Sequence, residues 1–561
     1  MTSLWELVEI IDTVIRHKKM PQNSHNHRRV FCLGFDGGAW TVLRPLMEAG
    51  RMPNLTKLAQ SGVSGVLHST IPPITPAAWS TFMTGCNAGK HGVFDFMAYD
   101  SQTHQTHFVN ATSLRVPTLW QALSQYGKRV AVVDMPVTYP PPEINGVVVS
   151  GLMTPSRQST FTYPANLLPE LEQHLGYEWP LLKEEEERGG LHEDFEGFLK
   201  LMQRFLQSRT EAMLYLFKKE PWDFSFLQWQ CVDFLQHPMW KYLEESHPAF
   251  SHTRHGQVVQ QFFVPLDQAL GRLLAAAKKY LGEETLFVIV SDHGFQRHRK
   301  RVELNHWLHA QGFLVPAEHG RTSWMRWAEA IRRADVWHLR KRWLPKSRRN
   351  ALGNKLRAQR IDHERSRFFA VSAFWGYVYL GPNATSQDVH LLETKLKAWR
   401  DPQTEQPIAR KIHRREDCFA GEVLERLPQL IIEPMPGYTF ATKTYFNSGN
   451  VLAPVPEEDF QTGTHAREGI FVLAGPGVES SRLWQASEAH LQDLMPTLLH
   501  WLGLPIPDYC DGSVRQEWFT PAQRERDVVY ANTKIALKEE VRLNELEQRE
   551  LEQRLQALGY L

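Results

Sequence analysis

The sequence places residues that could bind a metal ion directly after two runs of apolar residues. Asp292 and His293 follow residues 286–290 in LFVIVSDHGF, and Asp36 follows the run VFCLGF. Divalent metal ions accept carboxylate oxygens and imidazole nitrogens as ligands. Because open α/β folds bind their ligands at the carboxyl ends of the strands, this pattern indicates a metal-dependent α/β enzyme.

Two further segments supply a second group of candidate ligands. Asp233 follows the strand-like run FSFLQWQ, and His237 comes four residues later, so a single helical turn would point both side chains at one face. Pro238 should discourage further helix after them. His465 precedes the apolar run GIFVLAG, and the glycines that flank it should allow a loop to bring its imidazole back to the sheet edge.

We therefore expect two adjacent divalent metal sites, one formed by Asp36, Asp292 and His293 and the other by Asp233, His237 and His465. The mixture of carboxylate and imidazole suits zinc, with manganese as the alternative, better than calcium or magnesium alone. Each residue also has a purely structural interpretation. An aspartate after a strand often stabilises a turn, and most histidines in proteins bind no metal.

Thr75 is the candidate nucleophile. It precedes Pro76 in IPPITPAAWSTFMTG, and proline fits the first position of a helix. The free N–H groups and the dipole at a helix start favour an anion, so a phosphoryl group could rest there while the hydroxyl faces its phosphorus. A threonine hydroxyl is a weak nucleophile until a metal ion lowers its pKa. The structural alternative is that Thr75 only caps the helix.

Strand and helix patterns alternate around these residues. Between residues 30 and 150 the runs VFCLGF and GKRVAVVDM alternate with helical patterns, and the alternation resumes after about residue 420 with LPQLIIEP and GIFVLAGPG. This alternation predicts an α/β fold with a mostly parallel sheet covered by helices.

The 561 residues exceed what a single core usually organises, so we expect several parts. These are an N-terminal helix and linker (1–27), a catalytic core in two parts (28–298 and 421–528), an inserted basic cap or lid (299–420) and a charged C-terminal helix (529–561). The last helix carries Leu551, Leu555 and Leu558 at helical spacing, either to dock on the body or to pair with a partner.

The composition is that of an ordinary soluble globular protein, with 42% hydrophobic residues, 22% charged residues and a net charge of +1. Five scattered cysteines without CxxC spacing suggest neither a disulfide framework nor a zinc ribbon, and a reducing compartment fits them best. No run of about 18 apolar residues occurs. We therefore expect a cytoplasmic protein without a membrane span.

Residues 321–360 are strongly basic. They contain thirteen lysines or arginines against two acidic residues, Glu329 and Asp335, and four tryptophans are interleaved. We favour a solvated helical face or a lid that gathers acidic substrates, and an interfacial helix that makes peripheral contact with anionic lipid is the alternative. No nucleic-acid motif accompanies the charge, which makes nucleic acid the weaker partner.

The candidate residues stand in the order and local context seen in the type I phosphodiesterase/nucleotide pyrophosphatase branch of the alkaline phosphatase superfamily, which the sequence resembles. The similar blocks are PPITPAAW, TGCNAGKHGVFDF, VSDHGF, THAREGIFVLAGPG and DLMPTLLHWLGLPIPDYCDG. Within that branch the chain is more similar to the prokaryotic phosphohydrolase/phosphomutase-like members.

The resemblance implies a three-layer αβα fold, two zinc-like ions and in-line attack by the metal-bound threonine, giving a phosphothreonine intermediate that water hydrolyses. It also implies that Thr75 joins Asp36, Asp292 and His293 at one ion, while Asp233, His237 and His465 hold the other. Two ions roughly 3.5–4 Å apart would neutralise both the attacking and the leaving oxygen.

One residue departs from the family pattern. Phe96 in HGVFDF stands where nucleotide pyrophosphatases usually carry an asparagine that binds a phosphoryl oxygen, which argues against nucleotide substrates. The segment from Thr75 to Ala78 also lacks the Cys or Ser, Pro and Arg pattern of a sulfatase.

Our hypothesis is a two-metal-dependent phosphoric-ester hydrolase that acts on a phosphodiester or a phosphorylated small molecule. The alternatives are a phosphomutase-like phosphotransferase and a non-catalytic scaffold that retains the fold.

Overall fold

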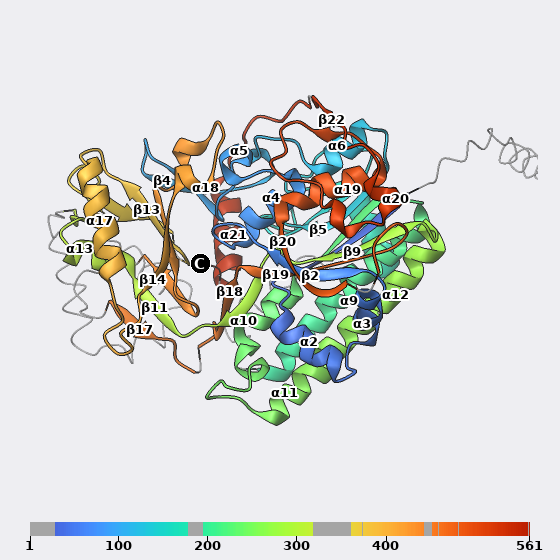
Figure 1. Ribbon diagram of the computed structural model, residues 1–561, viewed down its shortest axis with the longest axis horizontal. Coiled ribbons are helices and arrows are strands. Elements are labelled where there is room, and N and C mark those ends of the chain that lie inside the picture. The colour runs from blue at the N-terminus through green and yellow to red at the C-terminus, as the bar shows by residue number, and fades with distance from the viewer. Residues whose placement is uncertain are drawn as a thin grey trace, which may run out of the picture.

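The computed structural model describes residues 28–177, 194–317, 361–372, 374–442, 451–457, 459–480, 482–533, 535–558 and 560. It has a large lobe around a nine-stranded sheet and a smaller lobe, on the left of Figure 1, around a four-stranded sheet. The expected N-terminal helix (1–27) and the basic stretch (321–360) lie outside the described residues, so the hypotheses about a lid or a lipid contact stay predictions.

The large sheet has the strand order β20-β2-β19-β9-β1-β8-β5-β6-β7. Its strands are β1 (Arg29–Phe35), β2 (Val63–His68), β5 (Val130–Met135), β6 (Gly146–Ser150), β7 (Thr162–Tyr163), β8 (Phe224–Trp229), β9 (Thr285–Val290), β19 (Glu468–Ala474) and β20 (Arg482–His490). The neighbours β9, β1, β8, β5 and β6 run parallel, whereas β19 and β7 run antiparallel to their neighbours. The predicted mostly parallel sheet is confirmed.

Helices cover both faces of this sheet and complete three layers. Along β1, Phe31, Leu33 and Phe35 pack into the cluster on one face, while Val30 and Cys32 pack into the cluster on the other. The helices of the first face are α2 (Trp40–Glu48), α3 (Pro53–Gln60), α7 (Leu167–Leu175), α9 (Phe195–Lys219), α10 (Cys231–Leu243), α11 (His252–Val258) and α12 (Val264–Leu281). Those of the second face are α4 (Thr75–Thr84), α6 (Leu119–Gln125), α19 (Leu494–Leu502) and α21 (Glu545–Ala557).

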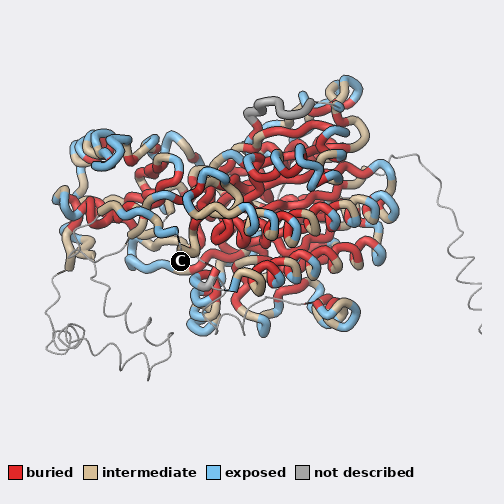
Figure 2. The backbone as a smooth tube through the Cα atoms, turned by 90° about the horizontal axis from the view of Figure 1, so that it is seen from below, coloured by how far each residue is buried: buried red, intermediate tan, exposed pale blue. Residues whose placement is uncertain are grey.

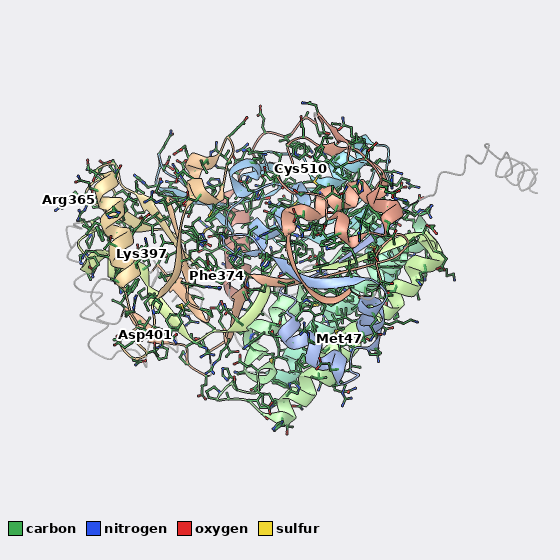
Figure 3. All side chains as sticks on the ribbon, in the orientation of Figure 1. Met47, Arg365, Phe374, Lys397, Asp401 and Cys510 are labelled. Atoms are coloured by element: carbon green, nitrogen blue, oxygen red, sulfur yellow. The ribbon has the colours of Figure 1, made fainter. Side chains whose placement is uncertain are left out.

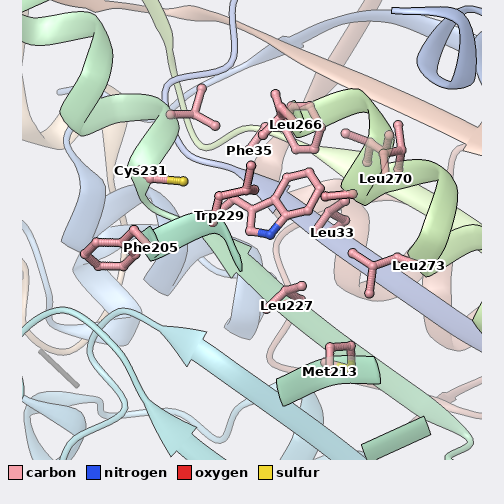
Figure 4. Close-up of a cluster of buried hydrophobic side chains, with 14 of the residues drawn as sticks. Leu33, Phe35, Phe205, Met213, Leu227, Trp229, Cys231, Leu266, Leu270 and Leu273 are labelled. Atoms are coloured by element: carbon pink, nitrogen blue, oxygen red, sulfur yellow. The ribbon is translucent and has the colours of Figure 1, made fainter. Parts of the chain in front are cut away.

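Burial on both faces explains why the central strands read as nearly continuous apolar runs. Figure 2 shows the buried backbone running through the middle of the large lobe. Figure 4 shows one part of this packing, in which Leu33, Leu227 and Trp229 of the sheet meet leucines of α12.

The smaller lobe contains a four-stranded antiparallel sheet in the order β12-β13-β15-β14. Its strands are β12 (Phe368–Ala370), β13 (Gly376–Leu380), β15 (Leu430–Pro434) and β14 (Ala409–Arg414), and the helices α13 (Leu304–Ala310) and α17 (Ser386–Ala398) contribute to its hydrophobic core. Three further strands, β11 (Lys300–Glu303), β16 (Tyr438–Ala441) and β17 (Leu452–Pro454), form a separate sheet.

The expectation that the large core resumes at LPQLIIEP is wrong. This segment forms β15, which pairs with β13 and β14 in the smaller lobe. A short buried strand such as Leu430–Pro434 fits any buried sheet, so the sequence pattern could not decide which sheet it joins.

The remaining elements are short. They are the hairpin of β3 (Met97–Asp100) and β4 (Gln105–Phe108), the pair of β10 (Gly294–Arg297) and β18 (Gly463–Ala466), and the pair of β21 (Ile506–Pro507) and β22 (Tyr530–Ala531). The short helices are α5 (Ala88–His91), α18 (Arg415–Cys418), α20 (Pro521–Arg524), the 3-10 turns η1 (Ala111–Ser113), η3 (Leu424–Arg426), η4 (Leu491–Asp493) and η5 (Gln516–Trp518), and the π-helical turn η2 (Val259–Phe263). Among the helices of the described segments, none is long and apolar enough to cross a membrane.

The helix expected over residues 529–561 is shorter than predicted. It begins only at Glu545, where Asn544 caps it and forms a reciprocal pair with Glu547. Before this point the chain lies extended on the core, because the Val541 N–H donates to Thr112 Oγ1 and the Val541 carbonyl accepts from Asn110 Nδ2. These tertiary hydrogen bonds replace the helical ones.

Of the two alternatives for this helix, the structure shows docking on the body. Leu551 and Leu555 of α21 are both 0% exposed and belong to the second-face cluster. In Figure 1, α21 lies between the two lobes.

Substituting Leu555→Ala should lower the free energy of unfolding by about 2–5 kcal/mol, because it removes a fully buried side chain and leaves a cavity. Leu546 on the same helix is 65% exposed, so Leu546→Ala should change the stability by less than about 0.5 kcal/mol. Equilibrium denaturation of both variants tests this, and equal stabilities would contradict the docking of α21.

Candidate metal centre

Three neighbouring parallel strands end at one edge of the large sheet and bring three aspartates together. Asp36 follows β1, Asp292 lies two residues after β9, and Asp233 stands in the first turn of α10, which follows β8. Because β9, β1 and β8 are adjacent and parallel, their carboxyl ends meet. All three side chains are 0% exposed.

The other four predicted residues converge on the same place. His293 follows Asp292, and His237 lies one helical turn after Asp233 on α10. Thr75 is the first residue of α4 and is 0% exposed. The structure therefore brings all seven predicted residues together, with His465 as the seventh.

His465 lies in strand β18 rather than in the loop that we expected. This strand pairs antiparallel with β10, so that His465 faces Phe295, the second residue after His293. The rings of His293 and His465 stack with their centroids 3.6 Å apart. Backbone pairing between segments distant in the sequence thus fixes the position of the His465 imidazole. The residues around His465 carry no sequence pattern that would predict this pairing.

The expectation that Pro238 ends the helix is also wrong, because α10 continues through it to Leu243. Proline disrupts a helix by removing a backbone donor. Here Thr462, just before β18, contacts the helix around the proline: its hydroxyl lies 3.1 Å from the carbonyl oxygens of His237 and Pro238, and the Lys241 N–H donates to it at 3.4 Å. These tertiary hydrogen bonds stabilise the helix where it continues past the proline.

All three histidines present the same nitrogen to the centre. In each ring Nδ1 lies next to a backbone carbonyl, which only accepts hydrogen bonds, so Nδ1 carries the proton and Nε2 keeps a free lone pair. The carbonyls are those of Gly463, Gly294 and Pro73, at 3.2, 3.0 and 3.0 Å from Nδ1 of His237, His293 and His465. A hydrogen bond from Nδ1 to a backbone carbonyl, which leaves Nε2 free, is typical of metal-binding histidines.

Each aspartate presents one bare oxygen to the same space. Oδ1 of Asp36, Oδ1 of Asp233 and Oδ2 of Asp292 are buried without a hydrogen-bond partner. A buried carboxylate oxygen without a donor is costly unless a cation compensates it.

The other oxygen of each carboxylate is held by a donor. Oδ2 of Asp36 accepts from Trp79 Nε1 at 2.9 Å and from Gln228 Nε2 at 2.6 Å. Oδ1 of Asp292 accepts from the Gly37 N–H at 3.1 Å. Gly37 needs its left-handed φ of +66° there, and a Cβ at this position would lie 2.9 Å from Phe295. These bonds fix which oxygen faces the centre.

The bare atoms form two groups of three, and within each group the ligand atoms lie within 4.8 Å of one another. In one group, Nε2 of His293 is 3.3 Å from Oδ2 of Asp292 and 3.7 Å from Oδ1 of Asp36. In the other, Nε2 of His465 is 3.3 Å from both Oδ1 of Asp233 and Nε2 of His237. The donor set fits two divalent ions that accept nitrogen and oxygen.

The pKa shifts of the site also indicate that a bound positive charge would stabilise it. Burial, and then the neighbouring charge of Asp292, raise the pKa of Asp36 well above its usual value, and burial raises the pKa of Asp292 as well. Burial alone would raise the pKa of Asp233, but the imidazoles of His237 and His465 outweigh it and hold that pKa below its usual range.

Burial lowers the pKa of His237 to about 4 and that of His293 well below its usual value. The imidazoles of His237 and His293 are therefore neutral near pH 7, which is the form that binds metal ions. Neutral imidazoles leave the negative charge of the carboxylates uncompensated, so a bound cation would stabilise the centre.

Thr75 lies at the edge of the first group. Its Oγ1 is 3.4 Å from Nε2 of His293, and the helix α4 that it begins is buried along its whole length. The same helix carries Trp79, whose indole nitrogen holds Asp36. One element therefore positions the hydroxyl and a carboxylate ligand together, and its N-terminus points a positive dipole end at the site.

Sequence reasoning missed several residues that support the site. Gln228 and Gln230 end the strand-like run FSFLQWQ, and both side chains are buried. Two amides at the end of an otherwise apolar run could have indicated a polar site there. Trp79 lies on the turn after Thr75 in α4. Phe374 of the smaller lobe, labelled between the lobes in Figure 3, reaches His465 with ring centroids 4.9 Å apart. Neither Phe374 nor Tyr560, which donates to Asp233, had a local signal.

Comparison with known proteins identifies the family of the chain. Residues 30–465 match the sequence profile of the family described as type I phosphodiesterase/nucleotide pyrophosphatase. No curated protein sequence matches the chain significantly.

Two solved structures with a similar fold are distant from this chain in sequence. Phosphonoacetate hydrolase from Sinorhizobium meliloti 1021, in complex with phosphonoformate, is 16% identical, with a TM-score of 0.52 over 84% of this chain and 94% of that one. Inactive murine ectonucleotide pyrophosphatase/phosphodiesterase 5, in complex with AMP, is 14% identical, with a TM-score of 0.50 over 88% of this chain and all of that one. These similarities confirm the predicted alkaline phosphatase-like α/β fold.

Adding Zn²⁺ to metal-free protein should raise its stability, by about 2.7 kcal/mol at a concentration 100 times the Kd, because an ion bound by the folded state stabilises it. The effect should weaken as the pH falls, since protons compete for Asp36 and Asp292, whose pKa values are raised. Thermal unfolding with and without Zn²⁺ measures it.

Asp233→Asn should reduce this stabilisation, whereas His298→Gln should not. His298 is a buried histidine whose two ring nitrogens contact Gln461 and Thr439 instead of the centre. A Zn²⁺ effect that survives Asp233→Asn unchanged would contradict the assignment of Asp233 as a ligand.

Proposed function

The chain belongs to the type I phosphodiesterase/nucleotide pyrophosphatase family, which makes it a phosphoester hydrolase, and we propose that it uses two divalent metal ions and Thr75 as its nucleophile. Asp36, Asp292 and His293, together with Thr75, would hold one ion, and Asp233, His237 and His465 would hold the other. Zinc is the ion that best suits this donor set, with manganese as the alternative.

One observation carries the proposal: the Thr75 hydroxyl lies 3.4 Å from Nε2 of a histidine whose lone pair is free, beside three bare carboxylate oxygens. A hydroxyl that only capped a helix would accept from the backbone of its own first turn. The capping position of α4 is instead Ile74, and Thr75 turns its oxygen into the centre.

The reaction that fits this geometry has two displacements. Oγ1 of Thr75 attacks phosphorus and forms a new P–O bond, while the bond to the leaving alcohol breaks and that oxygen takes up a proton. Water then attacks the phosphothreonine, releases the phosphate product and returns the proton to Thr75. The bound ions would lower the pKa of the Thr75 hydroxyl and offset the charge of the phosphoryl oxygens.

The start of α4 supports the substrate in this scheme. The helix dipole and the unpaired N–H groups of a first turn favour an anion, so a phosphoryl group held there would face Oγ1 of Thr75. We propose a phosphodiester or a phosphorylated small molecule as substrate. AMP in the murine structure and phosphonoformate in the bacterial one are both small molecules with a phosphoryl or phosphonyl group, which supports this class.

Thr75→Ala should lower kcat for bis-p-nitrophenyl phosphate by at least about 1000-fold, because loss of a nucleophile leaves only binding and electrostatic effects. Thr75→Ser should retain part of the activity. The assay uses Zn²⁺- or Mn²⁺-loaded protein, with p-nitrophenyl phosphate in parallel to compare monoester and diester preference.

Ser80→Ala is the matched control. Ser80 lies on the same helix, is 0% exposed, and its hydroxyl has no hydrogen-bond partner, so its loss should leave turnover nearly unchanged. Full turnover by Thr75→Ala with normal metal content would rule out the proposed nucleophile.

A covalent intermediate on Thr75 also predicts the stereochemistry. Each in-line displacement inverts phosphorus, so two displacements should give net retention. Hydrolysis of a p-nitrophenyl phosphorothioate diester of one configuration in ¹⁸O-labelled water measures the outcome. Inversion would show direct attack by water, and transfer of the thiophosphoryl group to an added alcohol in place of water would identify a phosphotransferase.

A further inference from the structure

Tyr560 lies three positions beyond the end of α21, and its side chain contacts the candidate metal centre although it is 327 positions from Asp233 in the sequence. Its hydroxyl donates a hydrogen bond to Oδ2 of Asp233 and accepts one from Gln230 Nε2 at 3.2 Å. Its ring lies 4.9 Å from that of Phe96 and 5.8 Å from that of His237, measured between centroids. The side chain is therefore seated in the wall of the site rather than in solvent.

The docking of α21 holds Tyr560 in this place. Leu551 and Leu555 of the helix are fully buried, and the Tyr560 N–H donates to the Leu555 carbonyl at 2.9 Å. Arg554, which is 5% exposed, donates to the carbonyls of Thr154 and Pro155. A helix anchored by apolar and by charged contacts leaves the tyrosine little freedom to move away.

The Tyr560 hydroxyl binds one oxygen of the Asp233 carboxylate, just as other donors bind one oxygen of Asp36 and one of Asp292. Oδ2 of Asp36 and Oδ1 of Asp292 are tied to donors of the large lobe. For Oδ2 of Asp233 we find no second donor among the described residues, so the hydrogen bond from Tyr560 holds this oxygen while the other oxygen faces the histidines. The oxygen left bare, Oδ1, lies 3.3 Å from Nε2 of His465 and 3.5 Å from Nε2 of His237.

A row of amides connects this contact to the other half of the centre. Gln230 donates to Tyr560, Gln228 lies 3.4 Å from the Gln230 side-chain oxygen, and the same Gln228 amide donates to Asp36. The three side chains are buried or partly buried. The hydroxyl is thus one end of a hydrogen-bonded chain that runs behind both groups of ligands.

We propose that Tyr560 is a positioning residue of the metal centre: it holds Oδ2 of Asp233 so that Oδ1, with His237 and His465, binds one of the two divalent ions. This inference rests on the proposed function, since it assigns a role at the same site. Residues that orient a metal ligand in this way typically contribute 10- to 100-fold to metal affinity.

The test compares Zn²⁺ binding by wild-type protein and by Tyr560→Phe, measured by competition with a chromophoric chelator. Removing the hydroxyl alone should weaken the binding of one ion by about 10- to 100-fold and leave the other ion bound as in the wild type. The ring stays, so its contacts with Phe96 and His237 are kept. Turnover of bis-p-nitrophenyl phosphate should recover when the Zn²⁺ concentration is raised, which a general loss of structure would not allow.

Tyr139→Phe is the matched control, because its hydroxyl donates to Glu547 of the same α21 helix at 3.2 Å, away from the ligands. It should bind both ions as the wild type does. Equal affinity of both ions for Tyr560→Phe would overturn the inference, and so would faster turnover at unchanged affinity, which would show that the tyrosine obstructs the site. Wild-type protein that binds no divalent ion would instead contradict the proposed function, and the inference with it.

Discussion

The structure depends on the burial of three carboxylates in one small space. Asp36, Asp233 and Asp292 are each 0% exposed, and within the described part of the chain the basic side chains in contact with them are histidines, with no lysine or arginine. Like charges so close in a low dielectric repel strongly. Each carboxylate has one oxygen bound by a donor, and the remaining bare atoms form two groups that could each hold a divalent ion.

The parallel sheet makes this geometry available. Adjacent strands β9, β1 and β8 end at the same edge, and turns and helices that begin there carry the ligands. The antiparallel strand β19 then returns the chain beside β9, and the β18 segment just before it carries His465 across to the centre. Asp233 and His237, which follow the parallel strand β8, thus meet His465, which precedes the antiparallel strand β19, although these segments lie far apart in the sequence.

Contacts outside the ligand set determine how the ligands are presented. Carbonyl groups fix the tautomers of the three histidines, and side chains from α4, β8 and the segment after α21 hold the carboxylates. Phe374 brings the smaller lobe against His465. The orientation of the ligands therefore depends on several packed elements. A substitution that removes one of these contacts should change the position of the ligand that it holds.

The sequence by itself determined the parts of this protein that local patterns encode. Asp36 and Asp292 could be recognised because each follows a buried strand, Asp233 and His237 because their spacing matches a helical turn, and Thr75 because proline marks a helix start. Alternating apolar runs also predicted the mostly parallel sheet. Each of these inferences depends on residues a few positions apart.

Only the tertiary structure decided which segments pair. It placed β15 in the smaller sheet, His465 in a strand and Thr462 against the helical turn at Pro238. It also brought Tyr560 to Asp233 across 327 positions of sequence and His465 to Pro73 across 392. Such contacts depend on how whole elements pack, and a short apolar run or a single tyrosine carries no local mark of the partner that it will meet.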